Sequence, residues 1–119
     1  MKEDQLNIDE TTLSIDLIDA TEAVKESRFE DALNLLSIIL KEHPDHIDSL
    51  YLAAVSTRYL KKFDDSKKYI ENLMFNAPDM GRAYQELGHL NRDMGNEEKA
   101  VVHYRQACEL NPALLAAWN

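Results

Sequence analysis

Cysteine, glycine and proline are scarce in this chain, and long apolar runs are absent. Cys108 is the single cysteine, so no internal disulfide can form, which is typical of proteins of a reducing cytoplasm. The longest uncharged stretch, residues 110–119, is too short to cross a bilayer. The start, Met1-Lys2-Glu3-Asp4, is acidic and unlike a secretory signal. We therefore expect a cytoplasmic protein without a membrane segment.

Catalytic and metal-binding motifs are also absent. The sequence has no glycine-rich phosphate loop, nucleophile elbow, His-Glu-x-x-His motif or cysteine pair. His43 and His46 could share a metal in principle, but they flank Pro44-Asp45 in a predicted turn, which favours solvated side chains. We expect no enzyme activity, no cofactor and no metal, and Cys108 to be a half-buried structural thiol.

The charge is acidic and unevenly spread. The chain has 13 Lys+Arg against 22 Asp+Glu, and residues 1–31 carry three bases and ten acids, a net charge of -7 out of -9. Nucleic acids and anionic membranes are therefore not expected as partners. A lysine cluster is interrupted by acids and is interpreted as a solvated helix face: Lys61, Lys62, Lys67 and Lys68, with Asp64, Asp65 and Glu71.

What the chain does have is a period. Its only prolines, Pro44, Pro78 and Pro112, recur every 34 positions, and small and large apolar residues recur in the same register. Apolar residues within each block recur at spacings of three and four, which indicates two amphipathic helices per block. We predict helices over 14–26, 29–42, 46–59, 63–76, 80–93 and 97–110, with a seventh beginning near 113.

The third block resembles the tetratricopeptide repeat at its aromatic, Leu-Gly, small and proline positions: Tyr84, Leu87, Gly88, Ala100, Tyr104 and Pro112. Asn91 stands where the family prefers an aromatic, and Asp16 and Asp19 stand at apolar positions of the first repeat. The resemblance implies three repeats, 13–46, 47–80 and 81–114. The fold it implies is an all-α, right-handed superhelix of three helix hairpins plus the start of a fourth repeat. Residues 1–12 would be a flexible acidic leader and 115–119 a stub of a further helix.

Close packing within each hairpin requires small residues where its helices cross. Ala54 and Gly88 of the first helices are expected to face Ser66 and Ala100 of the second helices. The predicted packing residues are Ala32, Ala54, Ser66, Gly88 and Ala100.

In the tetratricopeptide fold the exposed side of each first helix lines a concave groove. The resemblance places Leu17, Thr21, Val24 and Asp48 on this inner face, together with the residues predicted to bind a partner: Tyr51, Val55, Arg58, Tyr59, Arg82, Gln85, His89 and Arg92. Arg58 and Arg92, one repeat apart, are expected to be exposed on one azimuth and to suit a peptide with acidic groups. Reversing both charges should abolish binding without changing the fold.

One subclass of the family holds the C-terminal carboxylate of heat-shock chaperones in a clamp of Lys, Asn and Arg. The matching positions here are Leu17, Thr21, Leu52, Arg82 and Glu86, of which only Arg82 has the required charge. Chaperone co-factor activity is therefore not expected.

The function predicted is a non-catalytic protein-interaction module that binds a peptide or partner domain in its groove. The alternative is the N-terminal repeat region of a larger bacterial enzyme, for example a sulfotransferase-type protein, used for recruitment or self-association. A homodimer through the apolar segment 113–119 is also predicted. Leu35 and Ile38 exceed what one hairpin can bury, so we expect a cover, either the leader around Leu6, Ile8 and Leu13 or a second subunit.

Overall fold

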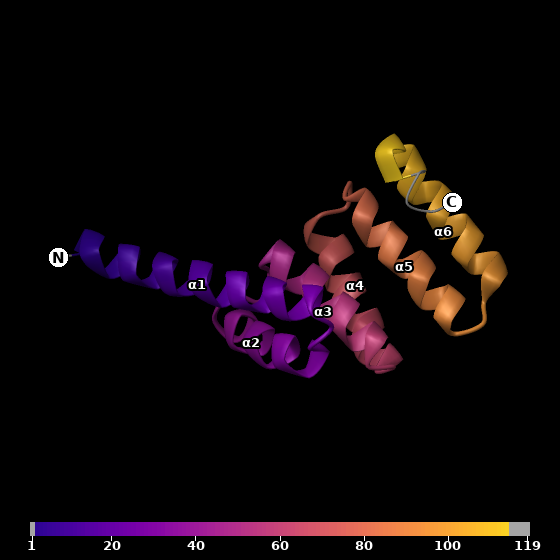
Figure 1. Cartoon of the computed structure of the whole chain (residues 1–119). Coiled ribbons are helices and arrows are strands. Elements are labelled where there is room, and N and C mark those ends of the chain that lie inside the picture. Colours follow the sequence, from indigo (N-terminus) through magenta and orange to yellow (C-terminus); the bar gives the residue numbers. More distant parts are fainter. Residues whose placement is uncertain (1, 115–119) are drawn as a thin grey trace.

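The computed structural model describes residues 2–114, with side chains described from Thr12 onward. Over this range the chain forms six α-helices and one 3₁₀ turn and contains no strand (Figure 1). The elements are α1 Lys2–Lys25, α2 Phe29–Glu42, α3 Ile47–Tyr59, α4 Phe63–Asn76, α5 Gly81–Asp93, α6 Glu97–Leu110 and η1 Pro112–Leu114. Helices pair as hairpin 1 (α1, α2), hairpin 2 (α3, α4) and hairpin 3 (α5, α6). The predicted all-α array of hairpins is confirmed.

The main difference from the predicted helices lies at the start of the chain. α1 begins at Lys2, whereas we predicted a helix from residue 14 after a leader over 1–12. Residues 2–13 contain neither glycine nor proline, so no residue there terminates the helix. In Figure 1, α1 continues beyond α2 as a single straight helix. The other helix boundaries agree with the prediction to within one residue, and the predicted seventh helix is a 3₁₀ turn as far as Leu114.

The turn inside each hairpin has one backbone geometry. Ser27, Lys61 and Gly95, which are one repeat apart, have φ of 60°, 62° and 85°. The next N–H in each turn donates to a carbonyl five residues back, as in a Schellman cap: Arg28 to Ala23 at 2.7 Å, Lys62 to Thr57 at 2.8 Å and Asn96 to Asn91 at 2.7 Å. Only glycine adopts this left-handed conformation without cost. The backbone therefore repeats more faithfully than the residue types do.

The link between hairpins is also repeated. A proline, Pro44 or Pro78, follows the last residue of α2 or α4 by two positions and cannot donate a backbone hydrogen bond, so the helix ends before it. The residue before each proline closes the final helical turn, with N–H to O distances of 2.8 Å from His43 to Ile39 and from Ala77 to Leu73. The three prolines thus mark where one hairpin ends and the next chain segment begins.

The helices of a hairpin cross at small residues. Ala32, Ala54, Ser66, Gly88 and Ala100 are all buried. The Ser66 hydroxyl donates to the Ala54 carbonyl at 2.9 Å, joining α4 to α3. A Cβ added to Gly88 would lie 2.6 Å from the Tyr104 ring. The side chain nearest Gly88 is therefore Tyr104 and not Ala100 as predicted, and its ring leaves room only for a glycine.

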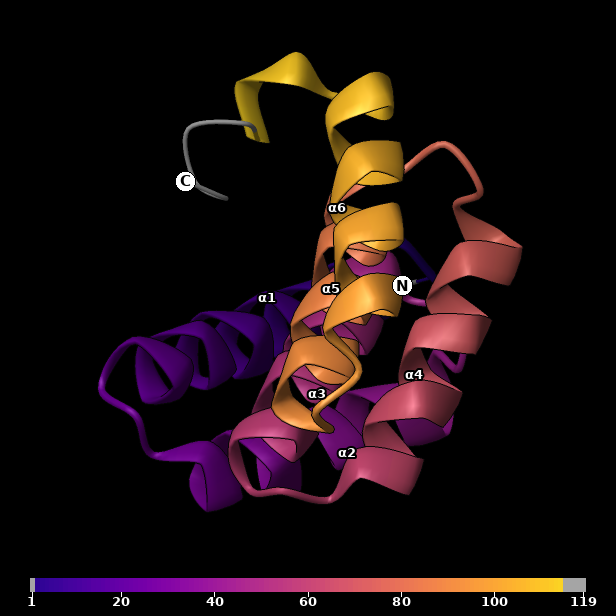
Figure 2. The same cartoon turned by 90° about the vertical axis from the view of Figure 1, so that its right-hand side faces the viewer.

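Successive hairpins pack through two contacts that we call the first and second junctions (Figure 2). The first junction, between hairpin 1 and α3, has a core of alanines with two larger residues: Ala20, Ala23, Ala32, Leu36, Ile39 and Ala53. The second junction, between hairpin 2 and α5, has two smaller clusters: Leu50, Leu73 and Ala83, and Ala54, Ile70 and Leu90. Stacking buries a hairpin face that no hairpin can bury alone.

Candidate protein-interaction site

The first helices of the three hairpins share one surface depression of about 200 Å³. Leu17 and Thr21 of α1, Arg82 of α5, and three residues of α3 line it: Asp48, Tyr51 and Leu52. Within the repeat, Tyr51 is in register with Leu17 and Arg82 is in register with Asp48, since the members of each pair are one repeat apart. The stacking of hairpins, and not any local motif, brings these side chains together.

The floor of the depression is apolar, and its side chains pack against the core of the array. Leu17 and Leu52 pack against the core of the first junction, and Tyr51 packs against Leu50 and Leu73 at the second. Burial, with a smaller contribution from the charge of Glu86, raises the pKa of Tyr51, so its phenol stays protonated. The half-buried hydroxyl of Tyr51 is therefore a neutral hydrogen-bond donor.

The two charged residues of the depression, Asp48 and Arg82, are both exposed. Neither takes part in any ion pair formed within residues 12–114. Asp48 is held in the first turn of α3, where the His46 ring accepts a hydrogen bond from the Ser49 N–H at 3.3 Å. The depression therefore presents one carboxylate and one guanidinium, from neighbouring first helices, to whatever occupies it.

Arg58 does not lie on the exposed inner face. Its side chain is 6% exposed, and Nε and Nη2 donate to the two carboxylate oxygens of Glu86 at 2.9 and 3.1 Å. Nη1 donates to Asp93 at 3.0 Å. The predicted ladder of exposed Arg58 and Arg92 is therefore wrong, because Glu86, itself 3% exposed, draws Arg58 into the second junction while Arg92 stays at the surface.

The electrostatics around this ion pair are dominated by burial and by close contact. Burial lowers the pKa of Arg58, but its hydrogen bonds to Glu86 and Asp93 outweigh that effect and raise it. Burial raises the pKa of Glu86 against the opposing influence of Arg58. Burial alone would raise the pKa of Asp93, but the hydrogen bonds and charges of Arg58 and Arg92 together lower it. Arg58 is thus permanently charged and is matched by two carboxylates of α5.

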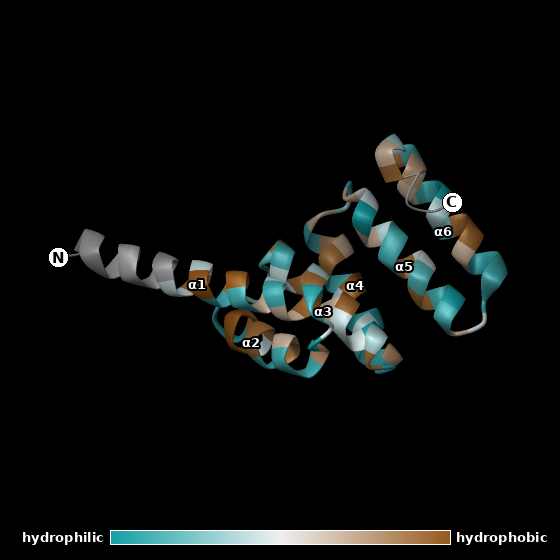
Figure 3. Cartoon of the chain, viewed as in Figure 1, coloured by the Kyte–Doolittle hydropathy of each residue, from teal (hydrophilic) through white to brown (hydrophobic). Residues whose placement is uncertain are grey.

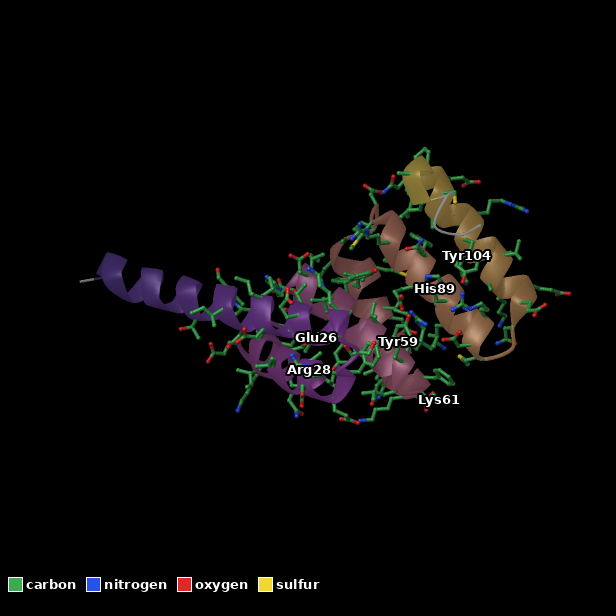
Figure 4. All side chains as sticks on the ribbon, viewed as in Figure 1. Glu26, Arg28, Tyr59, Lys61, His89 and Tyr104 are labelled. Carbon is green, nitrogen blue, oxygen red and sulfur yellow. The ribbon has the colours of Figure 1, made fainter. Side chains whose placement is uncertain are left out.

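Val55 and His89 also do not lie on an exposed inner face, since Val55 is buried in α3 and His89 is half-buried. The His89 Nδ1 atom is 2.6 Å from the Tyr104 hydroxyl, and Figure 4 shows the two side chains between α5 and α6. Burial, then the charges of Arg58 and Arg92, lower the pKa of His89 to about 4. The imidazole is therefore neutral at pH 7 and packs hairpin 3 together.

Comparison with known proteins identifies the third hairpin. The family model described as tetratricopeptide repeat matches residues 81–114, which contain hairpin 3 and η1. Residues 81–114 are therefore a tetratricopeptide repeat. A search of curated proteins finds no match to the sequence. Among its described residues, no helix is long and apolar enough to cross a membrane.

Solved tetratricopeptide structures share the fold at low sequence identity. MamA (MSR-1) superposes with a TM-score of 0.75 at 19% identity, covering 85% of this chain and 58% of its own. MamA (AMB-1) gives 0.76 at 19%, covering 93% and 66%. The first tetratricopeptide domain of Spaghetti (RPAP3), bound to the HSP90 peptide SRMEEVD, gives 0.77 at 17%, covering 86% and 81%. The chain thus spans less than two thirds of these MamA chains, and the likeness concerns the fold.

The positions that correspond to the carboxylate clamp of some tetratricopeptide repeats divide into two groups in this chain. Leu17, Thr21, Leu52 and Arg82 all line the depression. Glu86 does not, because its carboxylate is occupied by Arg58 inside the second junction. The Thr21 hydroxyl donates to the Leu17 carbonyl at 2.7 Å, within α1. Arg82 is therefore the single cation left at these positions.

Tyr59 is the exposed aromatic among the predicted groove residues, and it lies away from the depression. Its ring stacks on Phe29 of α2, with centroids 4.5 Å apart and planes 3° from parallel, and the Arg58 guanidinium lies 4.5 Å from its centre. Figure 4 shows it at the end of α3, near Lys61. Of the eight residues predicted for the groove, Tyr51 and Arg82 line the depression, Gln85 is half-buried, and Arg92 is exposed beside Asp93.

The residues that sequence reasoning missed are Glu86 and Asp93, which hold Arg58. The sequence records this pair only as two opposite charges 28 residues apart, Arg58 and Glu86, at different positions of the repeat. Reading each helix alone for its apolar stripe cannot pair them, because the pairing joins two first helices across a junction.

Proposed function

We propose that this chain is a non-catalytic, cytoplasmic interaction module that binds an extended segment of another protein across α1, α3 and α5. The observation that supports this most directly is the depression, because residues of all three first helices line it and Asp48 and Arg82 form no ion pair within the described residues. A segment lying across three parallel elements can contact each of them in turn. The peptide bound to the Spaghetti domain supports a peptide as the ligand class of this fold.

The chemistry of the depression narrows the ligand. Arg82 would pair with an acidic side chain, and the apolar floor of Leu17 and Leu52 would take an aliphatic one. The Tyr51 hydroxyl would donate to a ligand carbonyl, and Asp48 would accept from a basic side chain or an amide. We propose a segment with an aliphatic residue flanked by an acid on the α5 side and by a hydrogen-bond donor or base on the α3 side.

The test is a selection of random displayed peptides on the full chain, followed by titration of enriched peptides. We expect enriched sequences to share an acidic residue, and Arg82→Glu to weaken their binding by about tenfold or more, about 1.4 kcal/mol. Lys99→Glu is the matched control, because Lys99 is exposed on α6 and its reversal changes the net charge equally. Equal losses from both variants, or no enrichment at all, would contradict the proposal.

The homodimer and the role in a larger enzyme, both expected from the sequence, stay predictions. The homodimer through residues 113–119 involves a segment that from residue 115 onward lies outside the described residues, although Leu114 is buried beside Gly81. The role as a recruitment region of a larger enzyme would be tested by the length of the native open reading frame. Neither changes the expected behaviour of the depression.

A further inference from the structure

The two helices that pack on hairpin 2 from either side, α2 and α5, differ in character. Figure 3 shows more hydrophobic residues on α2 and more hydrophilic residues on α5. α2 has apolar side chains beyond those that its junction buries: Ile38 is 58% exposed, so the start of the chain does not cover it as one of our two predictions required. α5 has four charged side chains instead, Arg82, Glu86, Arg92 and Asp93. The second junction therefore has charges to match.

Two of these charges, Arg82 and Glu86, are neighbours on α5. Residues four apart in a helix lie one turn apart on the same side, where a cation and an anion attract each other. The charges of both residues reach Tyr51 of α3: burial raises the pKa of Tyr51 most, Glu86 raises it further, and Arg82 and Arg58 oppose the rise. Without another partner for Glu86, the two α5 side chains would be expected to pair, and Arg82 would then be occupied.

Glu86 is instead held by Arg58 of α3. The guanidinium donates from Nε to Oε2 at 2.9 Å and from Nη2 to Oε1 at 3.1 Å, so both carboxylate oxygens are engaged. The two side chains are 6% and 3% exposed, and salt and water screen a buried pair of this kind little. Arg82 is exposed and takes part in no ion pair formed within residues 12–114. The carboxylate one turn from Arg82 is thus engaged elsewhere.

We propose that Arg58 is a positioning residue of the depression: by holding both oxygens of Glu86, it keeps the Arg82 guanidinium free to pair with an acidic side chain of the bound segment. This role rests on the proposed function, in which Arg82 binds that acid. Arg58 also removes a repulsion, because a Glu86 carboxylate without a partner would lie one helical turn from the ligand's acid. Arg58 acts through Glu86 and does not itself line the depression.

The first experiment needs no ligand. Exchange of the arginine Nε–H protons with water is measured by nuclear magnetic resonance in the full chain, and the signal lost in Arg82→Lys identifies Arg82. In wild type, Arg82 should exchange as fast as Arg105, which is also exposed and without an ion pair in the described residues. In Arg58→Val, Glu86 should pair with Arg82 and slow its exchange about two- to fivefold, as expected of a partly exposed ion pair. Adding Glu86→Leu should restore fast exchange.

Asp93→Asn is the matched control for this measurement. It removes the other carboxylate partner of Arg58 and leaves the contact with Glu86 in place, so exchange at Arg82 should stay as in wild type. Circular dichroism checks the fold of each variant. If Arg58→Val is unfolded, Arg58→Lys replaces it and should also slow the exchange, because lysine keeps the positive charge but cannot form two parallel bonds. Unchanged exchange at Arg82 in the folded variant would overturn the proposal.

The second experiment uses the peptide most enriched on the wild-type chain, prepared with its acidic residue and with the corresponding amide. Arg58→Val should weaken binding of the acidic form about two- to fivefold and leave the amide form unchanged, because only the acid competes with Glu86 for Arg82. Adding Glu86→Leu should restore the affinity. Equal weakening of both forms would indicate a purely structural role and overturn the proposal. A selection that enriches no peptide contradicts the proposed function, and the exchange measurement still decides whether Arg58 keeps Arg82 free.

Discussion

The two junctions use the same repeat positions for different chemistry. At the first junction these positions hold Val24 and Leu52, which pack against the apolar core. At the second junction, one repeat later, they hold Arg58 and Glu86, a bidentate ion pair at 2.9 and 3.1 Å. The backbone arrangement is the same, and the residues that fill it are apolar in one case and charged in the other. The same two repeat positions can therefore be filled by an apolar pair or by an ion pair.

The difference concerns specificity more than stability. A buried ion pair loses the hydration of both charges, so an apolar pair of similar size often stabilises as well or better. What the pair adds is selection, because hairpin 2 offers a buried arginine that only a hairpin with a matching carboxylate can accept. Apolar junctions alone would let hairpins stack in several orders. We infer that Arg58 and Glu86 fix hairpin 3 as the successor of hairpin 2.

The largest effect is expected from breaking that pair. Glu86→Ala leaves the Arg58 guanidinium in a buried site with only Asp93, at the edge of the junction, as a partner. We expect a loss of about 3–5 kcal/mol in the free energy of unfolding, measured by urea titration. The sequence-based expectation that Arg58 can be reversed without harm to the fold does not hold, because Glu in its place would face two carboxylates.

The apolar pair of the first junction provides the control for this loss of stability. Arg58→Val with Glu86→Leu copies the first junction into the second, and Asp93 keeps its bond to Arg92. This double variant should lie within about 1.5 kcal/mol of wild type. If it is as unstable as Glu86→Ala, the ion pair has a structural role that an apolar pair cannot replace.

The next effect belongs to the apolar junction. Leu36 is fully buried in its core, and Leu36→Ala removes contacts that the surrounding alanines cannot replace. We expect a loss of about 3 kcal/mol from lost burial and the cavity. Because no charge is involved, this loss should be the same at low and high salt, in contrast to Glu86→Ala. A salt-dependent loss at Leu36 would remove the distinction between the junctions.

Sequence reasoning recovered the hairpins and failed at both junctions, where it placed Val24 and Arg58 on the exposed inner face, for a physical reason. The helices, the turns and the small crossing residues follow from local rules: spacing of apolar residues, regularly recurring prolines, and alanine or glycine where backbones approach. The burial of Arg58 follows from a carboxylate on another helix, which no local pattern records. Tyr51 and Arg82 line the depression because they share the inner azimuth, whereas Tyr59 lies away from it, because its stacking on Phe29 depends on the neighbouring hairpin.

A smaller effect should distinguish hairpin 3 from the rest of the array by its dependence on pH. The pKa of His89 is lowered from 6.5 to about 4 by burial and then by Arg58 and Arg92, so the unfolded chain gains a proton between these values and the folded chain does not. Unfolding free energy should therefore fall as pH drops from 6.5 to 4, by about 1 kcal/mol after allowance for solvent screening of the half-buried ring. His89→Gln should remove this part of the pH dependence. An unchanged pH profile in His89→Gln would contradict the assignment.

The smallest effects are expected in the turns, which both ends of the array share. Ser27 and Lys61 have φ of 60° and 62°, a conformation that costs residues with a Cβ about 1 kcal/mol, while Gly95 adopts φ of 85° at the equivalent position. Lys61→Gly should therefore stabilise the chain, by at most about 0.5–1 kcal/mol because glycine also loosens the unfolded state. Gly95→Ala should destabilise it by a similar amount, although no atom lies within 4 Å of the added Cβ. Opposite signs in urea titrations of the two variants would show that backbone conformation, and not side-chain contact, governs these turns; the same sign in both would refute it.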